Sequence, residues 1–126
     1  MGYAAKIRQQ NAKWVKAFRQ EKAAAIAALY AADSVLLPPQ TRRFLRGTAA
    51  IRNSWKETRE GFTECKFITD SLWSMGKKDS LVGEFGKFTA KPSRGKTMSG
   101  KYVVVWQRVG ATYKVRVDIA VFDTDD

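Results

Sequence analysis

The chain has 126 residues, of which 44% are hydrophobic and 12% aromatic, and this composition predicts one packed domain over residues 1–126 rather than a disordered chain. Histidine is absent, which excludes histidine-based triads and the commonest metal ligand, and the single cysteine, Cys65, excludes an intrachain disulfide. The 23 lysines and arginines against 12 acidic residues give a net charge of +11, large enough to attract polyanions.

The chain begins with helical periodicity. Residues 4–19 place Asn11, Trp14 and Phe18 on one stripe with other apolar side chains, which predicts a helix that covers a core. The alanine-rich residues 22–31 favour a second helix.

A short apolar strand is expected at residues 34–37, before two prolines end it. After a loop, Thr48 is a suitable N-cap for a third helix that carries Trp55 and Phe62. These helices precede every long strand.

From Thr63 onward the hydrophobic period changes from near four to two, which indicates strands. Turn signals separate four predicted strands at residues 63–75, 80–91, 97–109 and 112–122. Helices followed by a strand meander predict an α+β fold, with the N-terminal helices on one face of a curved antiparallel sheet.

The last strand is informative because its two faces differ. Strict alternation places Arg116, Asp118 and Ala120 on one face, which suggests a lined cavity containing a charged pair. The opposite face is too apolar for a solvated sheet, and we expect it to form a homodimer, sheet to sheet, through Val115, Val117, Ile119 and Val121.

Several short motifs, spread along nearly the whole chain, together resemble those of a known protein family. They are 11–14 (NAKW), 28–39 (ALYAADSVLLPP), 46–52 (RGTAAIR), 84–88 (EFGKF), 100–106 (GKYVVVW) and 113–115 (YKV) running into 118–119 (DI). In this order they resemble the SnoaL-like branch of the NTF2-like superfamily, cone-shaped α+β barrels that include ketosteroid isomerases and limonene epoxide hydrolases. The superfamily hosts many functions on one scaffold.

The resemblance implies a hydrophobic pocket between the helices and the concave face of the sheet. Alternation within the strands then nominates Glu84 and Phe88 on one wall and Arg116, Asp118 and Ala120 on another. Family members usually carry a large aromatic at the position of Ala120, so the cavity is expected to be roomier there.

Aromatic side chains supply further candidates for ligand contacts. Trp14, Tyr30 and Trp55 are candidates from the helices, each with core filling as the alternative. Tyr102 and Trp106 form a third row, but the sequence does not decide which face of the sheet they occupy.

Buried carboxylates could carry acid–base chemistry here. Arg116 is expected to keep Asp118 ionised, and an unpaired Glu84 could then carry the proton, as in a cofactor-independent isomerase or an epoxide-hydrolase-like enzyme. The alternative for the pair is a structural ion bridge with no catalysis. Whether the chain is an enzyme therefore stays open, beside a ligand carrier or a dimerisation module.

The expected partner is a small apolar molecule, with no metal and no other cofactor. Basic clusters occur at residues 87–101, which is predicted to be a hairpin end in solvent, and at Arg42, Arg43 and Arg46. Polyanion binding through the hairpin end is a lesser alternative, because aromatics are not interleaved with these charges and nucleic acid is not expected. The sequence contains neither a membrane-spanning run nor a signal peptide, so we expect a cytoplasmic protein that ends in an acidic tail at residues 123–126.

Overall fold

The computed structural model describes residues 2–41 and 43–123. Within these ranges the elements are α1 (Tyr3–Arg19), α2 (Ala23–Ala27), β1 (Tyr30–Leu37), β2 (Leu45–Arg46), α3 (Thr48–Gly61), β3 (Phe62–Met75), the 3-10 turn η1 (Lys77–Asp79), β4 (Leu81–Pro92), β5 (Met98–Val109) and β6 (Thr112–Phe122). Arg42 of the predicted basic loop and residues 124–126 of the predicted acidic tail lie outside the described residues.

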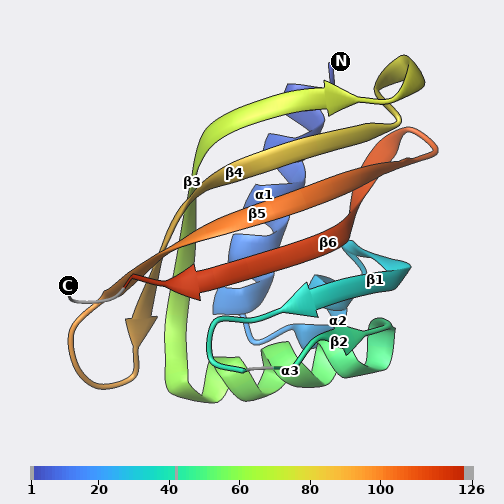
Figure 1. Ribbon diagram of the computed structural model, residues 1–126. Coiled ribbons are helices and arrows are strands. Elements are labelled where there is room, and N and C mark those ends of the chain that lie inside the picture. Colours follow the sequence, from blue (N-terminus) through green and yellow to red (C-terminus); the bar gives the residue numbers. More distant parts are fainter. Residues whose placement is uncertain (1, 42, 124–126) are drawn as a thin grey trace.

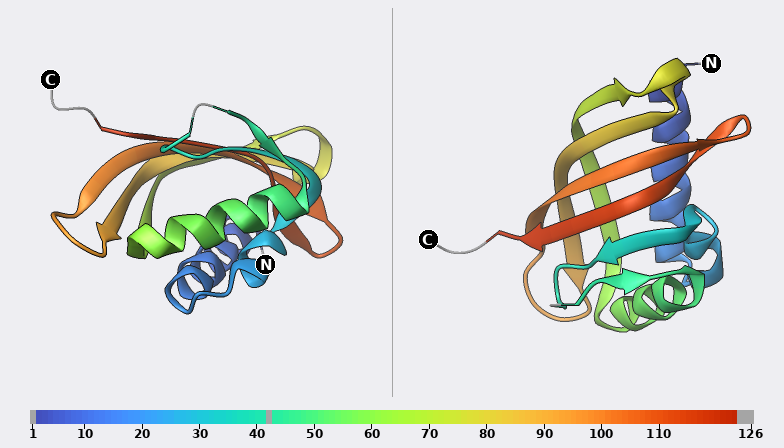
Figure 2. Two further views of the ribbon diagram at one scale, coloured as in Figure 1. Left: turned by 90° about the horizontal axis from the view of Figure 1, so that it is seen from below. Right: turned by 45° about the vertical axis from the view of Figure 1, so that its right-hand side comes forward.

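The strands form one mixed sheet in the spatial order β2-β1-β6-β5-β4-β3 (Figure 1). β1 runs parallel to β6, and the other neighbouring strands are antiparallel. The three α-helices lie on the same face of the sheet, which curves around them (Figure 2). The predicted α+β fold, with N-terminal helices on a curved, largely antiparallel sheet, is confirmed.

The first helix packs its predicted apolar stripe into the core. Ile7 and Phe18 of α1 are fully buried and Trp14 is 5% exposed. Opposite them, Trp55 from α3 meets Trp14 edge to face, with ring centroids 5.0 Å apart. Such packing of one face supplies most of a helix's stability in a protein, and here it fixes α1 and α3 over the concave face of the sheet.

The second helix is shorter than predicted. α2 ends at Ala27, and Tyr30 already begins β1, which pairs with β6 at Val115. The backbone N–H of Val115 donates to the carbonyl of Leu29 at 2.9 Å. Helix propensities differ by less than about 1 kcal/mol per residue, so parallel pairing with β6 outweighs the alanine-rich composition. Tyr30 therefore reaches the core from a strand and not, as predicted, from a helix.

Two details of the third helix also differ from the prediction. The helix starts at Thr48, but its N-cap is Gly47, and no side chain provides a capping hydrogen bond there. Gly47 has a φ of +89°, a conformation that glycine adopts without steric cost. Phe62, predicted in this helix, is the first residue of β3.

A β-bulge in β6 decides which of its side chains face the helices. Val115 pairs with Trp106 and Val117 pairs with Val105, so Arg116 is an extra residue without a partner on β5. The extra residue shifts the alternation by one position. The predicted uninterrupted alternation is therefore wrong at Arg116, and Val115 is a buried core residue, 3% exposed, instead of part of the outer face.

The basic hairpin end between β4 and β5 lies in solvent, as predicted, with residues 93–99 exposed. In the described ranges, no helix combines the length and apolar character that crossing a membrane requires. The cytoplasmic location stays a prediction.

Candidate functional site

A small cavity lies between the concave face of the sheet and the helices. Its volume is about 60 Å³, compared with roughly 30 Å³ for one water molecule in the liquid. Among the described residues that line it, Asp118 is the one carboxylic acid, and none is a lysine or arginine. Nearly half of these lining residues are aromatic: Trp14, Tyr30, Trp55, Phe62, Phe67, Phe88, Tyr102, Trp106 and Phe122.

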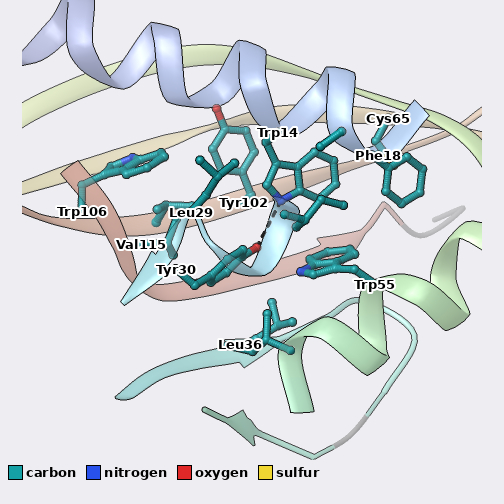
Figure 3. Close-up of a cluster of buried hydrophobic side chains, with 14 of the residues drawn as sticks. Trp14, Phe18, Leu29, Tyr30, Leu36, Trp55, Cys65, Tyr102, Trp106 and Val115 are labelled. Atoms are coloured by element: carbon teal, nitrogen blue, oxygen red, sulfur yellow. Dashed lines mark hydrogen bonds between the residues drawn. The ribbon is translucent and has the colours of Figure 1, made fainter. Parts of the chain in front are cut away.

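Asp118 lies on the β6 wall of this cavity and is held by a hydrogen bond. The Tyr30 hydroxyl donates to Asp118 Oδ2 at 2.7 Å. The Trp14 indole N–H donates in turn to the Tyr30 oxygen at 3.3 Å, as Figure 3 shows. Burial raises the pKa of Tyr30, with a smaller contribution from the charge of Asp118, so the tyrosine stays a hydroxyl donor. This arrangement fixes the Asp118 carboxyl against the cavity.

Burial raises the pKa of Asp118 from 3.8 to about 6. The hydrogen bond from Tyr30 opposes this rise, and the nearby charge of Glu84 adds to it. The prediction that an adjacent arginine keeps Asp118 ionised is wrong in its cause, because no guanidinium from the described residues lines the cavity. A carboxyl that titrates near neutral pH is suited to moving protons.

Glu84, on β4, is completely buried and does not line the cavity. Four side chains donate hydrogen bonds to its carboxylate: Tyr102 Oη at 2.6 Å, Thr69 Oγ1 at 2.7 Å, Trp106 Nε1 at 2.8 Å and Asn11 Nδ2 at 3.1 Å. Three of these donors, Asn11, Tyr102 and Trp106, line the cavity themselves. The structure thus places Glu84 behind the cavity wall, where it orients side chains that a bound molecule would touch.

The two carboxylates belong to one row across the sheet. Glu84 pairs with Val104, and Val104 pairs with Asp118. At the usual strand spacing their backbones lie roughly 10 Å apart. This separation leaves Asp118 to face the cavity without direct contact with the second carboxylate.

Arg116 does not join Asp118 in the cavity. Its guanidinium donates to the Asp33 backbone carbonyl at 2.9 Å and forms an ion pair with the Asp33 carboxylate. Both side chains of this pair are substantially exposed, 38% and 70%. The prediction of a buried Arg116–Asp118 pair is wrong, because the bulge turns Arg116 out of the inward row.

The remaining predicted positions do surround the cavity. Tyr102 and Trp106, whose facing the sequence left open, point toward the helices, as do Phe88 and Ala120. Together with Trp14, Tyr30 and Trp55 they form a continuous lining, and their role as ligand contacts stays a prediction.

Some residues of the site were missed by the sequence analysis. Phe62, Phe67 and Phe122 complete the wall, and Asn11 links α1 to Glu84. A signal for Asn11 was present, since a polar residue on an otherwise apolar helical stripe is expected to find a buried partner. The pattern gave no such indication for the three phenylalanines.

Cys65 also lines the cavity, but its chemistry is suppressed. The side chain is buried, and burial raises the pKa of the thiol to about 12. Since the thiolate is the nucleophile, Cys65 acts as a small apolar wall residue. No cluster of three or more acidic or thiol side chains that could hold a metal ion occurs within 2–41 and 43–123.

Comparison with known proteins gives one family match. Residues 12–116 match the model of the SnoaL-like domain, which covers most of the chain. No curated protein matches the chain.

Solved structures with the same architecture come from several bacteria. A candidate calcium/calmodulin-dependent protein kinase II association domain from Xanthomonas campestris superimposes with a TM-score of 0.85 at 15% identity, over 100% of this chain and 91% of the other. An NTF2-like protein of unknown function from Shewanella oneidensis gives 0.79 at 15% identity, over 94% and 98%. A ketosteroid isomerase-like protein from Erwinia carotovora gives 0.80 at 11% identity, over 96% of each chain. At these identities the likeness shows a shared fold alone.

Proposed function

Because the chain belongs to the SnoaL-like domain family of the NTF2-like superfamily, we propose that it binds a small, largely apolar molecule in the cavity and moves a proton on it without a cofactor. One observation carries this proposal: Asp118 is the one carboxyl among the described residues that line the cavity, and the rest of the lining is mainly aromatic and aliphatic, with Asn11, Gln40 and Thr58 as neutral polar side chains. Pockets of this kind, apolar with a few fixed polar groups, are typical of ligand sites.

The proposed chemistry is that of an isomerase or a hydrolase. Asp118 is mostly ionised at neutral pH, yet it is a stronger base than an exposed carboxylate because its pKa is about 6. It can remove a proton from an activated carbon or from water, and return it to another atom of the same molecule. Tyr30 holds the carboxylate in place during both steps. Glu84 takes a positioning role through Tyr102 and Trp106 instead of the proton-carrying role expected from the sequence.

The test is a panel of small enolisable ketones and epoxides incubated with the protein, followed by mass spectrometry and NMR of the recovered compounds. Conversion that disappears in Asp118→Asn, with binding retained, supports the proposal. Conversion that persists in Asp118→Asn refutes the role of this carboxyl.

The alternative is a non-catalytic module. Glu84 has all its donors from within the protein and does not reach the cavity, so Asp118 is the one carboxyl among the described residues that is free for chemistry there. The Xanthomonas structure is described as an association domain, which agrees with a binding role on this fold. Recovery of every bound compound unchanged from the same panel favours this alternative.

We also propose that a second copy of the chain covers the outer face of the sheet. Five large apolar side chains there are 39–60% exposed: Ile68, Trp73, Phe85, Val103 and Val121. They spread over β3, β4, β5 and β6, and exposed apolar patches of this kind mark interaction sites. The expected result is a dimer by light scattering at micromolar concentration, dissociated by Val103→Asp. A wild-type monomer at that concentration contradicts this proposal.

A further inference from the structure

One buried hydrogen-bond donor at the cavity has no acceptor. Trp55 is 7% exposed, and its indole Nε1 finds no hydrogen-bond partner among the described residues. The other two buried tryptophans are satisfied, since Trp14 donates to Tyr30 and Trp106 donates to Glu84. Buried polar groups are nearly always paired, so an unpaired one calls for a physical reason.

The position of the Trp55 ring is fixed by its neighbours. It packs edge to face against Trp14, with centroids 5.0 Å apart, and against Phe18, with centroids 6.4 Å apart. Figure 3 shows the indole nitrogen of Trp55, on α3, turned toward the Tyr30 hydroxyl. That hydroxyl already accepts from Trp14 and donates to Asp118. Burial is the main influence on the pKa of Tyr30, and the Trp55 N–H lowers that pKa in opposition to burial, but its contact with the hydroxyl lacks the geometry of a hydrogen bond. The free N–H is therefore held on the cavity wall beside the Tyr30–Asp118 pair.

We propose that Trp55 positions the ligand by donating its indole N–H to an acceptor oxygen of the bound molecule. This inference rests on the proposed function, because it concerns the same cavity, and it narrows the ligand class to small neutral molecules with an acceptor oxygen, such as ketones. Hydrocarbons cannot satisfy the N–H. Carboxylates would meet the negative charge of Asp118, with no lysine or arginine among the described lining residues to offset it.

The test compares two probes of nearly equal shape, cyclopentanone and methylenecyclopentane, which differ in the acceptor oxygen. Both are titrated into the wild-type protein, Trp55→Phe and the control Trp73→Phe, which makes the same change on the exposed outer face of the sheet. Binding is followed by ¹⁵N–¹H NMR, in which the resonance missing from Trp55→Phe identifies the Trp55 indole. We expect the ketone to bind the wild-type protein and Trp73→Phe roughly two- to tenfold more tightly than the alkene, as one hydrogen bond provides. In Trp55→Phe this preference is lost.

The outcomes separate this inference from the proposed function. Equal binding of both probes to the wild-type protein, or a ketone preference that survives in Trp55→Phe, overturns the role of Trp55 and leaves cavity binding intact. Failure of both probes to bind overturns both the role of Trp55 and the proposed function. If Trp55→Phe does not fold, the Trp55 indole resonance is assigned in the wild-type protein from its nuclear Overhauser contacts with Trp14 and Phe18. It must then move downfield with cyclopentanone and not with methylenecyclopentane, and the absence of that difference refutes the role of Trp55.

Discussion

Replacing Asp118 by asparagine is expected to stabilise the protein at neutral pH, although it removes the proposed proton carrier. The asparagine keeps an oxygen that can accept the Tyr30 hydrogen bond and loses the buried charge. Because the pKa of Asp118 is higher in the folded protein than in the unfolded chain, the stability it contributes is present below pH 4 and is lost as the pH rises through about 6.

The size of the effect follows from the pKa. A rise from 3.8 to about 6 corresponds to about 3 kcal/mol of unfolding free energy between acid and alkaline pH. Applying the linkage relation, about 2 kcal/mol of this change falls between pH 4.5 and pH 8. The free-energy gap between Asp118→Asn and the wild-type protein should therefore grow by that amount over this range, in favour of the variant.

Urea unfolding at pH 4.5 and pH 8, followed by tryptophan fluorescence, measures the gap. Asp70→Asn is the matched control, because it makes the same change at an exposed position on β3, and its gap should stay within about 0.5 kcal/mol. A gap for Asp118→Asn that is independent of pH, or that shrinks as the pH rises, would show that the carboxyl is not held in an apolar site.

Three other changes test the site. Tyr30→Phe removes the hydrogen bond that lowers the pKa of Asp118, so the titration midpoint of that carboxyl, followed by ¹³C NMR, should rise above about 6. Glu84→Gln replaces a buried acceptor of four hydrogen bonds and should lower the unfolding free energy by about 2 to 4 kcal/mol in urea titrations, and an unchanged value contradicts the network. Cys65, with a pKa of about 12 instead of 9.0, should react with a thiol reagent at pH 8 about a thousandfold more slowly in the folded protein than in urea, and comparable rates would mean that the cavity wall opens readily.

The inward rows of the long strands could be predicted because one face of this sheet is buried. Burial of one face specifies the register strongly, so a period of two is enough to place Phe88, Asp118 and Ala120 on the cavity side. The facing of Tyr102 and Trp106 could not be deduced in the same way. Both faces of β5 carry apolar residues, and the pairing of Val104 with Glu84 and Asp118 depends on the lengths of the neighbouring turns.

The outward position of the Arg116 side chain could not be predicted from the alternation of residues along the strand. A bulge adds one residue without any change of composition, and Val115 and Val117 on either side of Arg116 look equivalent in the sequence. The same limit applies to Tyr30. The alanines before it favour a helix, whereas a pairing partner more than eighty residues away along the chain places it in a strand.

The bulge also decides which side chains in the second half of β6 point toward the helices. If Arg116 paired with Val105, as in a strand without the bulge, the rest of β6 would slip by one position, and such a slip exchanges the two faces of a strand. The acid and its small neighbour Ala120 would then turn outward, and branched aliphatic side chains would take their places. The offset of one residue between β5 and β6 thus decides whether this wall of the chamber presents an acid or only hydrocarbon.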